Sequence, residues 1–202
     1  YNAFNNITDG IEAVNEGGTV HVMNGTYNLS STLTITKPLT LDGESQTGTI
    51  INASAVNGYG ITNLNDVDHI TLQDFTLFGP SADISSAYGL KMTHTDNLTI
   101  SNVVVQGSGR SEVDLNNVNG AILSDIFANG SNTKGVGVAL AGSSNINLSN
   151  ITTNSNNWGA IALYDYQDSD TYNVSFVNSM NLSEDITIYI DDESNYTGTV
   201  HD

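Results

Sequence analysis

Cysteine is absent from the 202-residue chain, so no disulfide framework holds the fold together. Proline is also scarce and occurs only twice. Long apolar runs are missing too, because no stretch reaches the roughly 18 residues that a membrane-spanning helix needs. The chain begins at Tyr1 without the basic and apolar segments of a secretion signal. We therefore expect a processed or excised extracellular domain that does not insert directly into a membrane.

Positive charge is scarce. Lysine and arginine together number 4 against 22 acidic residues, which gives a formal net charge of −18. Such a surface repels the phosphates of nucleic acids and anionic membranes, so we expect no nucleic-acid partner. An acidic chain of this kind suits a saline environment or one rich in divalent cations, where screening removes self-repulsion.

From residue 60 to 200 the sequence repeats itself about every 25 residues. Each unit has a short alternating strand, a polar turn, a second strand with Asn or Asp before an apolar residue, and a Gly/Asn/Ser-rich loop. The Asn or Asp falls at 74, 102, 125, 150 and 178, in steps of 28, 23, 25 and 28 residues. A nearly regular step that varies by a few residues predicts stacked coils whose loops differ in length.

Two sets of strands are expected in each repeat. The first strands are 60–64, 89–93, 112–116, 137–141, 160–164 and 185–190. The second strands are 69–75, 97–103, 120–126, 145–151 and 173–179. The first strands alternate apolar and polar residues, which indicates one buried face, and we expect them to span only about three to five residues.

This pattern resembles the right-handed parallel β-helix of the pectin-lyase-like superfamily over nearly the whole chain. The resemblance implies an all-β, single-stranded solenoid of about seven rungs. Asn and Asp suit its turns because both tolerate the left-handed backbone region. The resemblance also implies that they stack as an internal ladder with a structural role, formed by Asp74, Asn102, Asp125, Asn150 and Asn178.

The N-terminal segment carries a second resemblance. Phe4, Ile7, Ile11 and Val14 have helical spacing, which predicts an amphipathic helix over 4–15 that ends before two glycines. The segment that follows resembles the opening of surface and periplasmic β-helix proteins, where a helix covers the first rung. We expect residues 1–18 to form this cap and residues 19–202 a single β-helix domain of a longer protein. The C-terminal GTVHD shows no matching cap, which leaves the last rung open to self-association.

The outer face of the first strands offers candidate catalytic residues. Its column reads Thr62, Lys91, Asp114, Ala139, Ala162 and Thr187, which predicts a flat and shallow surface. By resemblance to polysaccharide lyases, Lys91, Arg110 and Asp114 supply the base and the cations that act on a uronate. The alternative, which we favour, is a structural cross-strand ion pair. The Asp-Asp with His-Gly of polygalacturonases, the Asp-Pro-His-Glu of alginate epimerases and the basic motifs of pectate lyases are all missing.

Aromatic residues precede the glycines that open several first strands. Tyr59-Gly60, Tyr88-Gly89 and Trp158-Gly159 occupy similar places in the repeat, and Tyr164 and Tyr166 follow closely. A row of rings on an exposed ridge is suited to stacking against sugars. The sequence therefore predicts ligand contact by Trp158, Tyr59, Tyr88, Tyr164 and Tyr166, although the same rings could instead cover the edge of the core.

Acidic turns and asparagine sequons complete the candidate sites. Asp165, Asp168 and Asp170 offer the hard oxygen ligands that Ca²⁺ requires, or they form a solvated turn. The histidines are scattered, so we expect no transition metal and no required cofactor. Eleven Asn-X-Ser/Thr sequons predict a glycoprotein, unless Asn-rich turns before Ser/Thr-rich strands create them incidentally.

These features favour an extracellular, non-catalytic β-helix module of a cell-surface or adhesin-type protein. Its expected partner is a polysaccharide or cell-surface glycan, or it contributes to surface assembly. One alternative is a lyase or epimerase acting on an acidic polysaccharide. Another is a filament or sheath subunit that stacks end to end through its C-terminal rung.

Overall fold

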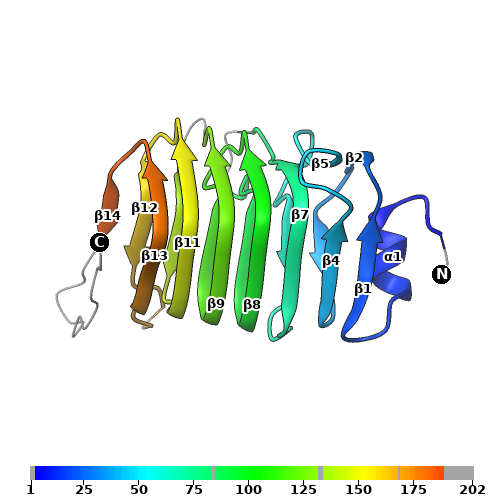
Figure 1. Cartoon of the computed structure of the whole chain (residues 1–202), viewed down its shortest axis with the longest axis horizontal. Coiled ribbons are helices and arrows are strands. Elements are labelled where there is room, and N and C mark those ends of the chain that lie inside the picture. Colours follow the sequence, from blue (N-terminus) through cyan, green and yellow to red (C-terminus); the bar gives the residue numbers. More distant parts are fainter. Residues whose placement is uncertain (1–2, 83–84, 132–133, 168, 189–202) are drawn as a thin grey trace.

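The computed structural model describes residues 3–82, 85–131, 134–167 and 169–188. The chain forms an all-β parallel solenoid of about six turns, with one short helix at its N-terminal end (Figure 1). This confirms the predicted parallel β-helix and is close to the seven rungs expected. The elements are α1 (Ile7–Ala13), β1 (Gly18–Val22), β2 (Gly25–Asn28), β3 (Leu33–Ile35), β4 (Leu39–Gly43), β5 (Thr49–Asn52), β6 (Ile61–Asn63), β7 (Ile70–Phe78), β8 (Leu90–Gln106), β9 (Val113–Asn129), β10 (Val136–Ala141), β11 (Ser144–Asn154), β12 (Gly159–Tyr164), β13 (Tyr172–Leu182) and β14 (Ile186–Ile188).

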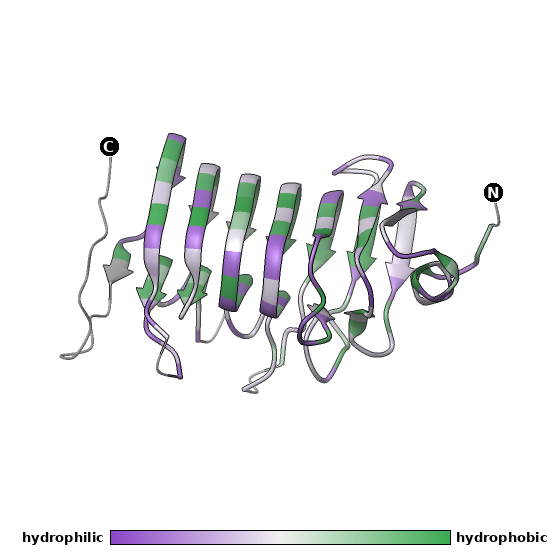
Figure 2. Cartoon of the chain, turned by 90° about the horizontal axis from the view of Figure 1, so that it is seen from below, coloured by the Kyte–Doolittle hydropathy of each residue, from purple (hydrophilic) through white to green (hydrophobic). Residues whose placement is uncertain are grey.

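The rungs stack in parallel register, and side chains at equivalent positions lie one above the other. Leu90 of β8 pairs with Ile61 of β6 and Val113 of β9, and Val138 of β10 continues the column to Ile161 of β12. All five side chains are buried in the core. Apolar and polar bands alternate along the strands, as expected when one face of each strand is inside (Figure 2).

The longest strands are longer than the sequence predicts. β8 and β9 each span 17 residues, and each contains a predicted first strand, the turn and a predicted second strand. The turns bend these strands without interrupting the backbone pairing between rungs, because His94, Asn97 and Asn102 in β8 adopt left-handed backbone angles. The expected boundary is therefore a corner within one continuous strand.

The Asn/Asp ladder lies on the outside of the solenoid rather than inside it. All five ladder residues are left-handed, with φ between 52° and 64°. Asn102 donates a hydrogen bond to Asp74, and Asn150 donates one to Asp125 over 3.0 Å. Asp74 is half-buried and the other four side chains are exposed. The implied internal ladder is wrong because the residue after each corner, such as Phe75 or Val103, is the one that enters the core.

The capping helix is shorter than predicted. It begins at Ile7 because the Asn6 side chain accepts the Asp9 N–H over 2.8 Å and so caps the first turn. Lys37 ties the C-terminal end of the helix to the solenoid by donating to the carbonyls of Glu12 and Val14, both over 2.9 Å. No helix in the described part of the chain is long and apolar enough to cross a membrane. The C-terminal GTVHD lies outside the described residues.

Candidate functional site

The predicted outward column exists on the face formed by β6, β8, β9, β10, β12 and β14. The register places Thr62, Lys91, Asp114, Ala139, Ala162 and Thr187 level with one another. Lys91 and Asp114 are therefore direct cross-strand neighbours, as the sequence predicts.

The middle of this column is covered, which corrects the prediction of a flat and shallow surface. Lys91 is 8% exposed and Asp114 only 1%, while Ala139 and Ala162 are 2% and 5% exposed. The Tyr88 ring lies 4.8 Å from the Lys91 ammonium, and Tyr164 packs against the two alanines. The covering rings come from a loop and from the end of a strand, so the strand column alone did not reveal them.

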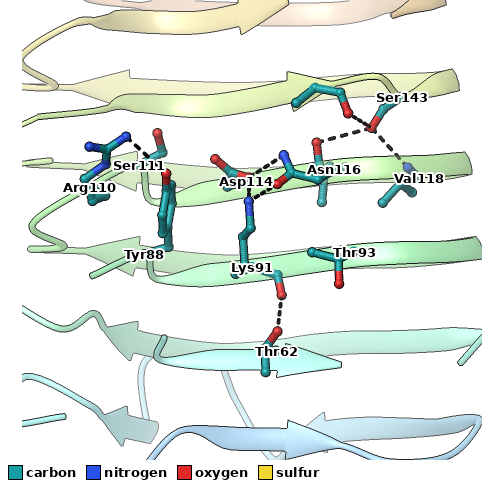
Figure 3. A network of polar contacts seen from close by, with 12 residues as sticks. Thr62, Tyr88, Lys91, Thr93, Arg110, Ser111, Asp114, Asn116, Val118 and Ser143 are labelled. Carbon is teal, nitrogen blue, oxygen red and sulfur yellow. Dashed lines mark hydrogen bonds and ion pairs between the residues drawn. The ribbon is translucent and has the colours of Figure 1, made fainter. Parts of the chain in front are cut away.

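Lys91 sits in a buried polar cluster with Asp114 and Asn116 (Figure 3). Its Nζ contacts Oδ1 of Asp114 and Oδ1 of Asn116, and Asn116 Nδ2 donates to Asp114 Oδ1 over 2.8 Å. Sequence analysis missed Asn116, which is 5% exposed. Its position in the sequence could have predicted this contact, because residues two apart on a strand share a face and a lysine reaches its diagonal neighbour on the next strand.

Burial sets the electrostatics of this cluster. Removal from water raises the pKa of the Asp114 carboxyl, and the neighbouring Lys91 opposes that rise. The pKa values of Tyr88 and Tyr164 are also raised, first by burial and then by the Asp114 charge. Water is thus largely excluded from a site that contains an amine, a carboxyl and a carboxamide in mutual contact.

Arg110 does not join this cluster. Its Nη2 donates to the Tyr88 hydroxyl over 3.1 Å, and its Cζ lies 5.3 Å from the centres of both the Tyr88 and the Trp158 rings. The guanidinium therefore bridges two aromatic rings rather than an acid and a base. Among the described side chains, Arg110 Nε is a buried nitrogen without a hydrogen-bond partner.

The aromatic residues do form a row, with one shift of register. Tyr59 and Tyr88 lie 6.1 Å apart with their planes tilted by 59°, and Arg110 continues the row to Trp158. Gly159 pairs with Val136, so Ala160 rather than Gly159 is level with Gly60 and Gly89. Trp158 therefore stands one position earlier than the other two rings. Its side chain is 55% exposed.

The other two predicted ligand residues differ in their setting. Tyr164 is half-buried over the alanines of the outer face. Tyr166 is 36% exposed in a turn in which its backbone and that of Ser169 exchange hydrogen bonds of 2.9 and 3.0 Å.

Glu112 is a buried acid that sequence analysis did not identify. It is level with Gly60, Gly89, Gly137 and Ala160, in a column otherwise made of very small residues. Its carboxylate accepts the Ser108 N–H over 3.0 Å and the Ser108 hydroxyl over 2.6 Å. Burial outweighs these bonds and raises the pKa of Glu112 to about 8.

The predicted calcium site is only partly within the described residues. Asp165 Oδ1 accepts the Thr171 N–H over 3.1 Å, and Asp170 is exposed. Asp168 lies outside the described residues, and no cluster of three metal-ligating side chains occurs among those described. Calcium at this turn stays a prediction.

Comparison with solved structures supports the fold. ORF18 of Geobacillus virus E2 superimposes with a TM-score of 0.72 at 16% identity, covering 84% of this chain and 37% of that one. The catalytic domain of a GH87 α-1,3-glucanase in complex with nigerose gives 0.71 at 14% identity, covering 87% and 33%. The chain thus spans about a third of the length of each of these structures.

Sequence comparison identifies the family. No curated protein matches the chain. A family profile described as rhamnogalacturonase A/epimerase, pectate lyase-like, matches residues 1–184, which is most of the sequence. The chain therefore belongs to the rhamnogalacturonase A/epimerase, pectate lyase-like family, within the pectin-lyase-like β-helix superfamily.

Proposed function

We propose that this chain is an extracellular, non-catalytic glycan-binding module of a cell-surface protein. The observation that carries the proposal is the row of Tyr59, Tyr88, Arg110 and Trp158 along one edge of the outer face. The groups precede β6, β8, β9 and β12, so they follow the solenoid axis, and the β10 rung between Arg110 and Trp158 contributes no member. A polysaccharide is an extended repeating ligand, and a linear row of rings matches it better than an enclosed pocket does.

The exposed member of the row is the main contact in this proposal. Trp158 presents 55% of its surface to solvent, and the guanidinium of Arg110 supports its ring from one side. Tyr88 is hydrogen-bonded to Arg110 and packed against the tilted ring of Tyr59, so it is pre-ordered and loses little conformational freedom on binding. The GH87 α-1,3-glucanase domain was solved with a disaccharide, which makes a sugar a reasonable class of ligand to test here.

A lyase or epimerase is the weaker proposal. Its three candidates diverge, because Asp114 and Lys91 contact each other under the Tyr88 ring while Arg110 bonds to the Tyr88 hydroxyl. A general base must reach the proton that it removes, and an acid that is 1% exposed lacks that access. End-to-end assembly depends on the last rung, of which residues 189–202 lie outside the described part.

Trp158→Ala is expected to weaken binding to immobilised glycans by roughly 5- to 30-fold, because truncating an exposed aromatic anchor removes about 1 to 2 kcal/mol of binding energy. Affinity electrophoresis through neutral and acidic polysaccharides measures the effect, with and without Ca²⁺. The matched control is Tyr172→Ala, which removes a ring that is 47% exposed on β13 and outside the row. Equal loss in both variants, or retention unchanged by Trp158→Ala, would argue against this surface.

A further inference from the structure

The cluster of Lys91, Asp114 and Asn116 contains every group needed to form a covalent cross-link. It presents a primary amine, a carboxamide and a carboxyl in contact with one another. All three residues are at least nine-tenths buried, at 8%, 1% and 5% exposure. Ordinary surface ion pairs are solvated and exchange freely with water, whereas these groups are held together on two neighbouring rungs.

We propose that Lys91 and Asn116 join spontaneously through an isopeptide bond, with Asp114 as the catalytic acid and base. The bond would link β8 to β9 across one rung of the solenoid. This goes beyond glycan binding, since it concerns a self-catalysed modification of the chain itself and does not depend on any ligand.

Register and side-chain direction bring the reacting groups together. Lys91 is directly opposite Asp114, and Asn116 is two residues further along β9 on the same outward face. The amine of Lys91 therefore extends diagonally and contacts the Asn116 carboxamide at Oδ1. Ordering by the sheet replaces a random encounter with a fixed near-attack arrangement, which is a large part of the advantage in any intramolecular reaction.

Asp114 is placed to move both protons. Its Oδ1 contacts Lys91 Nζ and also accepts a hydrogen bond from Asn116 Nδ2, the atom that must leave. Asp114 takes a proton from the Lys91 ammonium, and the free amine then attacks Cγ of Asn116. The Cγ–Nδ2 bond breaks as Asp114 gives this proton to the departing nitrogen and takes the second proton from the attacking nitrogen. The Lys91–Asp114 ion pair and one carboxamide thus become one secondary amide, one protonated carboxyl and one released ammonia, without any oxidant or cofactor.

The surroundings favour this direction of reaction. Ala139 and Ala141 lie level with Asp114 and Asn116 on the next rung, and the Tyr88 ring covers Lys91 on the other side. Burial raises the pKa of Asp114, which favours its protonated form once it has taken the proton from the amine. The reaction also replaces a buried ion pair by neutral groups, and it removes a charge that is costly to keep out of water.

Intact mass measurement of the denatured wild-type chain tests the proposal. We expect a mass lower than that of the sequence by one ammonia, about 17 Da. Lys91→Arg should restore the mass calculated for its sequence, while the control Lys134→Arg should still show the loss, since Lys134 is on an exposed loop. A wild-type mass equal to that of the sequence would overturn the proposal, and loss of a water in place of ammonia would overturn Asn116 as the acyl partner.

Trypsin then locates the bond. The chain has only four lysine and arginine residues, and trypsin does not cleave after Lys37 because proline follows it. Trypsin does not cleave after a modified Lys91 either, so residues 1–110 remain one peptide, and the isopeptide bond joins this peptide to 111–134. An unmodified chain releases 92–110 and 111–134 separately.

Asp114→Asn tests the catalytic role, because this variant keeps the shape of the side chain but lacks its acid and base chemistry. It should retain its full mass, and ammonia loss at the wild-type rate would show that Asp114 is not the catalyst.

Discussion

Replacing Asn116 with alanine is expected to lower the free energy of unfolding by roughly 3 to 4 kcal/mol, or the melting temperature by about 10 °C. The variant lacks the acyl partner of the proposed cross-link but keeps the contact between Lys91 and Asp114. The two linked positions are 25 residues apart, and closing a loop of that length restricts the unfolded chain much as a disulfide does. Urea unfolding followed by circular dichroism measures the change.

Asn63→Ala provides the matched control for this effect. Asn63 is also 5% exposed, on the inward face of β6 level with Ile35, and it bonds to the backbone of Thr93 over 2.9 Å in both directions. Its loss removes hydrogen bonds without removing a cross-link. We expect Asn116→Ala to increase the urea dependence of the unfolding free energy, because the unfolded chain becomes less compact, and Asn63→Ala to leave it unchanged. The same urea dependence in both variants would contradict a covalent link.

Raising the pH from about 6 to 9 is expected to destabilise the protein by a few kcal/mol, and Glu112→Gln should remove most of that loss. The pKa of Glu112 is about 8 in the folded chain against an ordinary value of 4.5. The folded state therefore binds the proton more tightly than the unfolded state does. The resulting stabilisation is fully present below pH 4.5 and is lost as the pH rises through about 8.

Thermal unfolding at a series of pH values tests this dependence. Glutamine reproduces the protonated carboxyl, since its carbonyl accepts the Ser108 N–H and its amide donates to the Ser108 hydroxyl in the places that Glu112 now occupies. Glu12→Gln is the control, because Glu12 is exposed on α1. A wild-type melting temperature that stays constant from pH 6 to about 9, or one that falls equally in Glu112→Gln, would show that this carboxyl does not control the dependence.

The solenoid was predictable from sequence because its physical signals repeat. Left-handed corners recur at Asp74, Asn102 and Asp125, and the apolar residue after each corner recurs with them. A single rung would give an ambiguous pattern, whereas repetition at a nearly constant step fixes both the strands and their register. The side on which the ladder faces was wrongly inferred, because a family resemblance rather than the apolar neighbours supplied it.

The site was less predictable because it depends on what covers the strands. Lys91 and Asp114 were correctly placed opposite each other, but Lys91 is covered by the ring of Tyr88, which comes from a loop. Loop conformation sets that contact, and no periodicity reports it. Glu112 could have been noticed as a large acid in a column of glycine and alanine, where a side chain has little space except toward its own loop.

Incubation of the wild-type chain and Trp158→Ala with acidic polysaccharides, followed both by retention and by the ultraviolet absorbance of unsaturated uronate, distinguishes a glycan-binding module from a lyase. We expect retention that depends on Trp158, with no increase in absorbance at any calcium concentration. An increase in absorbance that Arg110→Ala abolishes would contradict it, and would show that this face of the β-helix is a lyase active site.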